Sequence, residues 1–197
     1  MTQYHPFHKK IRDMLRENGL DKEYEIKEDP ACVIEPRIHG KKKMLPLYCD
    51  CNSNYFLDQN IHQLDICWVD IIIKKWKINE IPIVIEIDES ITSPHHICGK
   101  FLTAAVSRYY HDGNDRYPLS PKTLFIQVVK TKVEPSVKSQ MRAKWKILED
   151  YINNNLLIEN SRIKGYLLFW GYEKGNELVN ENGNDFIESI QNHMKST

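Results

Sequence analysis

The order of extended and helical patterns along the chain predicts an α/β fold, in which a mixed central β-sheet is flanked by helices. Two runs, LDICWVDIII at 64–73 and IPIVIEID at 81–88, are rich in the β-branched and aromatic residues that favour strands. Other segments have apolar residues at the spacing of one helix face, and they lie before and after these two runs. We therefore expect helices to pack against a sheet built around the two runs.

The first predicted element is an amphipathic helix over Pro6–Asn18, which Asn18 and Gly19 end. Its apolar residues at helical spacing are Phe7, Ile11, Met14 and Leu15. Residues 30–62 give a weaker pattern, in which Cys32–Ile38 is a possible strand. The two strand runs follow, and the polar connection KKWKINE between them predicts a β-hairpin.

The remaining elements alternate between helix and strand. Ser93 and Pro94 are residue types that favour the N-cap and the first position of a helix. Ile97, Phe101, Ala104, Ala105 and Tyr109 then recur at helical spacing. In order, the sequence predicts a helix over Pro94–Tyr110, a strand over Thr123–Val129, a helix over Ser136–Asn153, a strand over Gly165–Trp170 and a helix over Asp185–Met194.

The composition is typical of one soluble globular domain spanning residues 1–197, of which 41% are hydrophobic. The 27 Lys and Arg residues balance 27 Asp and Glu residues, so no global field draws the protein to nucleic acid or to a membrane. Apolar runs fall far short of the roughly 20 residues of a spanning helix, and the start of the chain lacks a secretory signal. With five cysteines, we expect a cytoplasmic protein with free thiols.

One segment is locally basic. Residues 120–146 contain seven Lys and Arg residues and one Glu. Such a segment can face a polyanion, although a solvated helix face would give the same pattern. Together with Trp145, Tyr109 and Tyr110, it is the best candidate in the sequence for contact with a nucleic-acid backbone. Glycines are scattered and form no phosphate-binding loop, so we do not expect ATP hydrolysis.

Two acids interrupt the strand Ile81–Asp88. Side chains alternate along a strand, so Glu86 and Asp88 project with Val84 to one face. An alternative for Asp88 is that it merely begins a polar turn before the next helix. Glu86 is harder to explain in this way, because it lies within a run of isoleucines that is expected to be buried.

A third acid lies on the neighbouring strand. Asp70 directly precedes three isoleucines and can lie beside Glu86 in the hairpin, although Asp65 competes for that place from the other face. Buried carboxylates that repel one another cost several kcal/mol each unless something offsets their charge. A divalent cation does so, and oxygen ligands without a matching His or Cys favour Mg²⁺ or Mn²⁺.

With these residues in this element order, the sequence resembles the PD-(D/E)XK nuclease superfamily, which has the restriction-endonuclease-like fold. The signature of the superfamily is an Asp that opens a strand, followed by hydrophobic-Glu-x-Lys on the next strand, within an α-β-β-β-α-β core. Here Asp70 opens the first strand, and Glu86 follows sixteen residues later within Ile85-Glu86-Ile87-Asp88. The resemblance covers about residues 64–130.

The sequence departs from this signature at one position, because Asp88 stands where the family has lysine. Some members have an acid there, and in others the lysine comes from the following helix. Lys100 lies at the edge of the predicted helix stripe and can reach back toward the strand end. The alternative is a solvent-facing helix lysine. Gln127, polar within an apolar strand, can contact the active-site face or substrate, or simply satisfy groups at a sheet edge or a helix end.

The resemblance implies a Mg²⁺-dependent DNA endonuclease of the restriction-enzyme type. Asp70, Glu86 and Asp88 would hold one or two Mg²⁺ or Mn²⁺ ions, and Lys100 would be the fourth catalytic residue. The protein would act as a homodimer, since one active site cuts one strand. The alternatives are a non-catalytic nuclease-like module that binds nucleic acid or a partner protein, which the missing lysine favours, and a metal-independent interaction domain.

Overall fold

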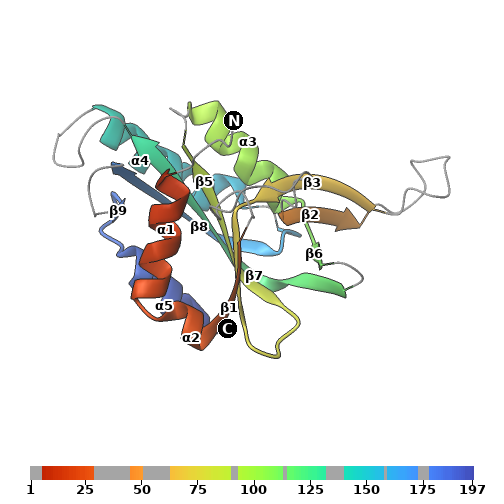
Figure 1. Cartoon of the computed structure of the whole chain (residues 1–197). Helices are drawn as coiled ribbons and strands as arrows, with labels where there is room; N and C mark the ends of the chain where they lie inside the picture. The colour runs from red at the N-terminus through yellow and green to blue at the C-terminus, as the bar shows by residue number, and fades with distance from the viewer. Residues whose placement is uncertain are drawn as a thin grey trace, which may run out of the picture.

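The computed structural model describes residues 6–28, 45–50, 63–89, 93–112, 115–131, 140–157, 159–172 and 178–197. It is an α/β protein with a mixed, strongly curled β-sheet and five α-helices (Figure 1). In chain order the elements are α1 (Pro6–Glu17), α2 (Leu20–Glu23), β1 (Tyr24–Glu28), β2 (Leu45–Asp50), β3 (Gln63–Val69), β4 (Ile71–Lys75), β5 (Ile81–Asp88), α3 (Pro94–Ala105), β6 (Tyr109–Asp112), β7 (Asp115–Thr131), α4 (Gln140–Tyr151), a π-helical turn (Ile152–Leu156), β8 (Ile163–Tyr172), β9 (Leu178–Val179) and α5 (Phe186–Ser196).

The sheet follows the path β1-β4-β5-β7-β6-β2-β3, and β8 and β9 extend it from β7. The pairs β1/β4 and β4/β5 are antiparallel, whereas β5/β7 and β7/β8 are parallel. Parallel neighbours require a crossover connection, and helices α3 and α4 lie in these two connections. The first half of the long strand β7 pairs with β6 and its second half with β5 and β8, which curls the sheet.

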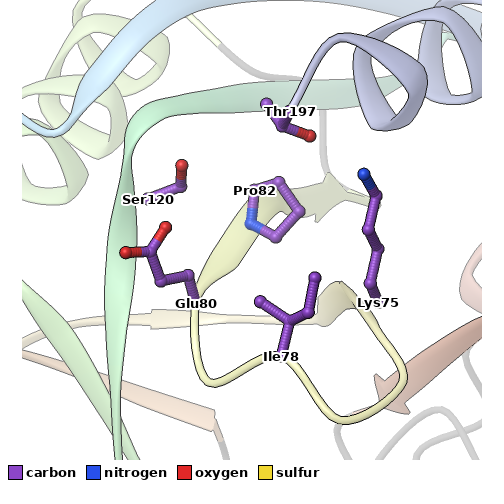
Figure 2. Close-up of a pocket in the computed structure, with 6 residues that line it drawn as sticks. All are labelled: Lys75, Ile78, Glu80, Pro82, Ser120 and Thr197. Atoms are coloured by element: carbon purple, nitrogen blue, oxygen red, sulfur yellow. The ribbon is translucent and has the colours of Figure 1, made fainter.

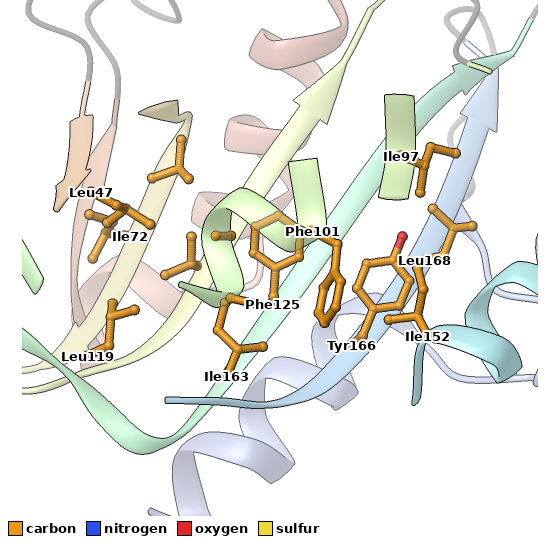
Figure 3. Packing of buried hydrophobic residues seen from close by; sticks show 14 of the residues in the cluster. Leu47, Ile72, Ile97, Phe101, Leu119, Phe125, Ile152, Ile163, Tyr166 and Leu168 are labelled. Carbon is orange, nitrogen blue, oxygen red and sulfur yellow. The ribbon is translucent and has the colours of Figure 1, made fainter. Parts of the chain in front are cut away.

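Helices cover both faces of the sheet, as the pattern of helices and strands predicted. On one face α1 and α5 bury residues such as Phe7 and Phe186 in a cluster with Ile83, Ile85 and Ile87 of β5. On the other face Phe101 of α3 packs against Phe125 of β7 and Tyr166 of β8 (Figure 3). Trp145 of α4 belongs to the same cluster. Val84 belongs to this second face, so the two acids that follow it at alternate positions, Glu86 and Asp88, face α3.

The hairpin of β4 and β5 is confirmed, but the strand run that begins at Gln63 is broken. It bends at Asp70, so β3 pairs with β2 while β4 pairs with β1 and β5. The first strand of the core is β1, which the sequence analysis missed because its residues YEIKE alternate too weakly to stand out. The possible strand Cys32–Ile38 lies outside the described residues.

The predicted helix over Pro94–Tyr110 is wrong at its C-terminal end, because α3 stops at Ala105. Tyr109 and Tyr110 instead form β6 and pair with Pro118 and Tyr117 of β7. Aromatic residues fit a strand as well as a helix stripe, so spacing alone could not separate the two. Across the described ranges, no helix is long and apolar enough to cross a membrane.

A buried acid joins α4 to β8. Glu149 accepts hydrogen bonds from the backbone N–H of Leu168 at 2.9 Å and from the side-chain amides of Asn180 at 2.8 Å and Asn182 at 2.6 Å. Burial nevertheless raises the pKa of Glu149 above that of an ordinary carboxyl group. The network satisfies the carboxylate but does not remove the cost of its charge.

We expect Glu149→Gln to reduce the pH dependence of stability. A carboxyl pKa that is raised in the folded state favours folding below the unfolded pKa of about 4.3, and this contribution is lost as the pH rises through the folded pKa. Wild type should therefore lose more stability than the neutral variant between about pH 4 and about pH 7. Urea unfolding across this range measures the difference, with exposed Glu159→Gln as the control. Parallel pH profiles of wild type and Glu149→Gln would contradict the account.

Candidate active site

Two acids lie at the C-terminal end of β5 and face α3. The whole strand is buried, and Glu86 and Asp88 are only 6% and 4% exposed. Neither of them is a solvated turn residue, so the polar-turn alternative for Asp88 is wrong. Two carboxylates in this environment require partners, because burial strongly disfavours an unpaired charge.

The Lys100 side chain supplies the partner from α3. Its ammonium contacts the carboxylate of Glu86 and lies 2.8 Å from Oδ1 of Asp88. Helix α3 buries a stripe that contains Ile97 and Phe101, and Lys100 lies at the edge of this stripe, where its stem reaches the strand end. The side chain of Lys100 is 30% exposed, so it is not a freely solvated helix lysine.

Asp70 lies beside this pair, at the bend between β3 and β4. Its backbone N–H donates to the carbonyl of Ile85 at 3.1 Å, and its Oδ2 accepts from the N–H of Ile87 at 2.6 Å. These bonds tie Asp70 to β5, while the backbone of Asp65 pairs with Tyr48 of β2. Of the two acids that the sequence left open, Asp70 is therefore the one that the structure brings to Glu86.

A histidine from α1 also reaches the site, and the sequence analysis missed it. His8 Nε2 lies 3.1 Å from Oδ1 of Asp70, and Nδ1 lies 2.9 Å from Oε1 of Glu89. The same Glu89 oxygen accepts the backbone N–H groups of Phe7 and His8 and so holds the first turn of α1 against the end of β5. Because the pairing joins residues more than 60 positions apart, no local pattern could have revealed it.

Both ring nitrogens of His8 face carboxylate oxygens, which accept hydrogen bonds when ionised. Burial lowers the pKa of His8, but the hydrogen bonds and charges of Asp70 and Glu89 raise it overall above its ordinary value. The geometry and the charges therefore both favour the imidazolium form, which donates from both nitrogens. In this form His8 fixes the orientation of the Asp70 carboxylate.

The acids of the site outnumber the lysine that pairs with them. Burial raises the pKa of Glu86 well above that of an ordinary carboxyl group, and Asp70 and Asp88 add to this effect while Lys100 opposes it. Burial alone would lower the pKa of Lys100, but Glu86 and Asp88 raise it above its usual range. The lysine therefore stays charged, and two acids, Glu86 and Asp88, share its single positive charge.

The acids have the donor chemistry for a divalent cation. Asp70, Glu86 and Asp88 offer hard carboxylate oxygens, and a dication would offset the repulsion that raises the pKa of Glu86. In the part of the chain that the structure describes, however, no three His, Cys, Asp or Glu side chains already form a group that could hold a metal ion. Lys100 contacts Glu86 and Asp88 instead. The metal role of the three acids therefore stays a prediction.

Gln127 does contact the face of the sheet that carries the acids. Its Nε2 donates to Oδ2 of Asp88 at 2.8 Å, and its Oε1 accepts from the hydroxyl of Tyr166 at 3.0 Å. Gln127 is fully buried, so it does not satisfy groups at a sheet edge. Tyr166 was not predicted as part of the site, because it belongs to β8 and lies far along the chain.

Cys67 lies near the acids, but its thiol is not in the reactive thiolate form. Its sulfur is 3.6 Å from the hydroxyl of Ser107, and burial raises its pKa to about 12. A thiol with this pKa is almost entirely protonated at neutral pH, so it is not a nucleophile.

The aromatic part of the predicted nucleic-acid surface is wrong. Trp145, Tyr109 and Tyr110 are all buried, and the guanidinium of Arg116 covers the ring of Tyr109 at 3.6 Å. Because these rings are packed inside the protein, they are not accessible for stacking on bases. In the basic segment, Lys122 and Lys144 are exposed, so the electrostatic part of the prediction stays open.

A small pocket lies at the opposite end of β5 from Glu86 and Asp88 (Figure 2). Its lining residues are Lys75, Ile78, Glu80, Pro82, Ser120 and Thr197. Its volume is about 30 Å³, which is enough for a water molecule but not for a nucleotide.

Searches against family models, curated proteins and solved structures find no match to this chain. The assignment of roles must therefore come from the geometry and chemistry of these side chains.

Proposed function

We propose that this protein is a divalent-cation-dependent DNA endonuclease with a restriction-endonuclease-like fold. The observation that carries the proposal is the contact of the Lys100 ammonium with both Glu86 and Asp88, beside Asp70. A lysine that meets carboxylates at the end of a sheet resembles the Glu-x-Lys site of PD-(D/E)XK nucleases. Here the following helix would supply the lysine in place of the strand.

The arrangement of the elements supports the same proposal. Helix α1, the antiparallel strands β1, β4 and β5, helix α3 and the parallel strand β7 occur in the order of the α-β-β-β-α-β core, with α2, β2, β3 and β6 inserted between them. In that core the active site would lie on the two strands of the β4–β5 hairpin. Here Asp70 directly precedes β4, and Glu86 and Asp88 lie at the C-terminal end of β5. Other folds also carry mixed sheets, so the side chains bear more of the argument than the topology does.

Each residue has a role in this proposal. Asp70 and Glu86 provide carboxylates for one or two Mg²⁺ or Mn²⁺ ions, and Asp88, which also contacts Lys100, is a third candidate ligand. The chemistry that such an ion supplies when bound is polarisation of the scissile phosphate and a lower pKa for an attacking water. The Lys100 ammonium stabilises the negative charge that develops on the phosphate in the transition state. His8 keeps the carboxylate of Asp70 in a fixed orientation.

The proposed substrate is DNA, and the proposed active unit is a homodimer, because one active site cuts one strand. Lys122 and Lys144 are candidates for contacts with phosphate groups, since both are exposed and belong to the basic segment 120–146. Such contacts give affinity that falls as salt concentration rises but carry no sequence information.

Incubation of plasmid DNA with the protein tests the proposal. We expect nicked or linear DNA in the presence of Mg²⁺ or Mn²⁺ and intact supercoiled DNA in the presence of EDTA. The control is a matched preparation of Glu86→Gln, which excludes a contaminating nuclease. Supercoiled DNA that stays intact with both metal ions, at protein concentrations that saturate binding, would contradict the proposal.

A specific observation also favours a second candidate, a non-catalytic nuclease-like module that binds nucleic acid or a partner protein. Lys100 already neutralises part of the charge of Glu86 and Asp88, so these acids can persist in the fold without a metal ion. Binding of DNA without cleavage, and without dependence on Mg²⁺, would favour this candidate over the enzyme.

A further inference from the structure

The strand position at which the resembled nucleases carry lysine holds Asp88, and this carboxylate lies in the middle of a buried hydrogen-bonded chain. We propose that Asp88, backed by Gln127 and Tyr166, is a positioning residue that holds the Lys100 ammonium against Glu86. This role differs from that of a third metal ligand. Its catalytic meaning rests on the proposed function, whereas the chain of hydrogen bonds can be tested without any activity.

Both carboxylate oxygens of Asp88 have donors. Oδ1 lies 2.8 Å from Nζ of Lys100 and 3.5 Å from Nε2 of His96, while Oδ2 accepts from Nε2 of Gln127 at 2.8 Å. A buried carboxylate persists when it is paired and hydrogen-bonded, and Asp88 meets both conditions with protein groups alone. Asp88 therefore requires no metal ion to offset its charge, and its contacts direct it toward Lys100.

The neighbours of Gln127 fix the orientation of its amide. An ionised carboxylate only accepts hydrogen bonds, so Gln127 must turn its NH₂ group toward Asp88. The amide oxygen then faces the hydroxyl of Tyr166 at 3.0 Å, and Tyr166 must donate. The reversed amide would place two acceptors together at Asp88, inside a fully buried site. The charge of Asp88 thus sets the direction of every bond in the chain.

Tyr166 joins the hydrogen-bonded chain to the aromatic residues that pack against α3. Its hydroxyl begins the polar chain, and its ring packs edge-on against Phe101 with ring centroids 5.4 Å apart (Figure 3). Phe101 follows Lys100 directly on α3, and Phe125 stacks with the Tyr166 ring with centroids 6.1 Å apart. The hydroxyl of Tyr166 therefore positions Asp88 through Gln127, and its ring positions the helix that carries Lys100.

Lysine-selective ¹⁵N NMR of the ammonium groups tests the chain directly, because hydrogen bonds slow their exchange with water. We expect Lys100 to give a signal distinct from those of exposed lysines such as Lys144. Gln127→Leu should shift or broaden this signal, and Tyr166→Phe, which removes only the hydroxyl, should do so to a smaller extent. The matched control is Tyr151→Phe on α4, where the side chain is 54% exposed.

The same variants separate positioning from metal binding. With Mn²⁺, we expect Gln127→Leu and Tyr166→Phe to lower the single-turnover cleavage rate roughly tenfold. Their Mn²⁺ affinity should stay close to that of wild type, whereas a metal ligand would lose affinity and rate together. Tyr151→Phe should match wild type in both measurements.

Two results would overturn the proposal. The first is a folded Gln127→Leu protein, or a folded Tyr166→Phe protein if the former does not fold, in which the Lys100 signal is unchanged. The second is a loss of Mn²⁺ affinity in these variants in proportion to the loss of rate. A wild-type protein that neither cuts DNA nor binds Mn²⁺ would defeat the proposed function alone, and the NMR comparison would still decide the positioning role.

Discussion

Glu86→Gln should abolish cation-dependent DNA cleavage while the protein stays folded. Glutamine has nearly the same shape, so the packing around position 86 survives, but one of the carboxylates that would bind the cation is lost. A metal ion contributes several kcal/mol of transition-state stabilisation, so we expect a rate loss of roughly 10³-fold or more. Single-turnover cleavage of a labelled duplex measures it.

The stability of Glu86→Gln should not fall below that of wild type at neutral pH. The raised pKa of Glu86, caused by burial and by Asp70 and Asp88, means that the ionised form is disfavoured in the folded state. A neutral side chain removes this penalty, and Lys100 keeps Asp88 as a partner. Glu80→Gln, at an exposed position directly before the same strand, is the control. Cleavage at the wild-type rate by Glu86→Gln would remove Glu86 from the catalytic assignment.

Lys100→Met should lower the cleavage rate by about 10²-fold or more, because it removes a charge that is already positioned at the acids. Methionine keeps much of the apolar stem, so the stripe of α3 can still pack. DNA affinity should fall only slightly, since one charge among several is lost. Single-turnover cleavage and equilibrium binding of the same duplex separate the two effects.

The matched variant for this comparison is Lys195→Met. Lys195 is exposed on α5 and lies outside the basic segment 120–146. We expect this change to leave the cleavage rate near that of wild type, within the few tenths of a kcal/mol typical of surface substitutions. If Lys100→Met cleaves as fast as Lys195→Met, then Lys100 is an ordinary helix lysine with no role in cleavage.

The sequence predicted the parts of the site that follow from local periodicity. Glu86 and Asp88 share a face because side chains alternate along a strand, and Lys100 lies near them because helical spacing places it beside a buried stripe. Antiparallel pairing of β4 with β5 brings Asp70 next to β5. The residues that flank Asp70, and those that flank Glu86 in β5, are apolar. Each of these inferences requires only one element and its immediate neighbour.

The contacts that the sequence did not reveal join elements far apart in the chain. His8 and Glu89 meet because α1 packs its first turn on the end of β5, and no pattern at either position indicates this. Tyr166 is an ordinary apolar-strand residue until β8 places its hydroxyl on Gln127. The bend at Asp70 was missed for a different reason, since strong strand residues continue on both sides of it.

The central claim is that Asp70 and Glu86 bind a divalent cation, and a Mn²⁺ titration followed by electron paramagnetic resonance tests it most directly. The spectrum of free aqueous Mn²⁺ should lose intensity as wild-type protein is added, and Mg²⁺ should restore it by competition. The same titration with Glu86→Gln should leave most of the Mn²⁺ free. If wild type and Glu86→Gln leave the free Mn²⁺ signal equally undiminished, the acids do not form a metal site and the nuclease assignment is wrong.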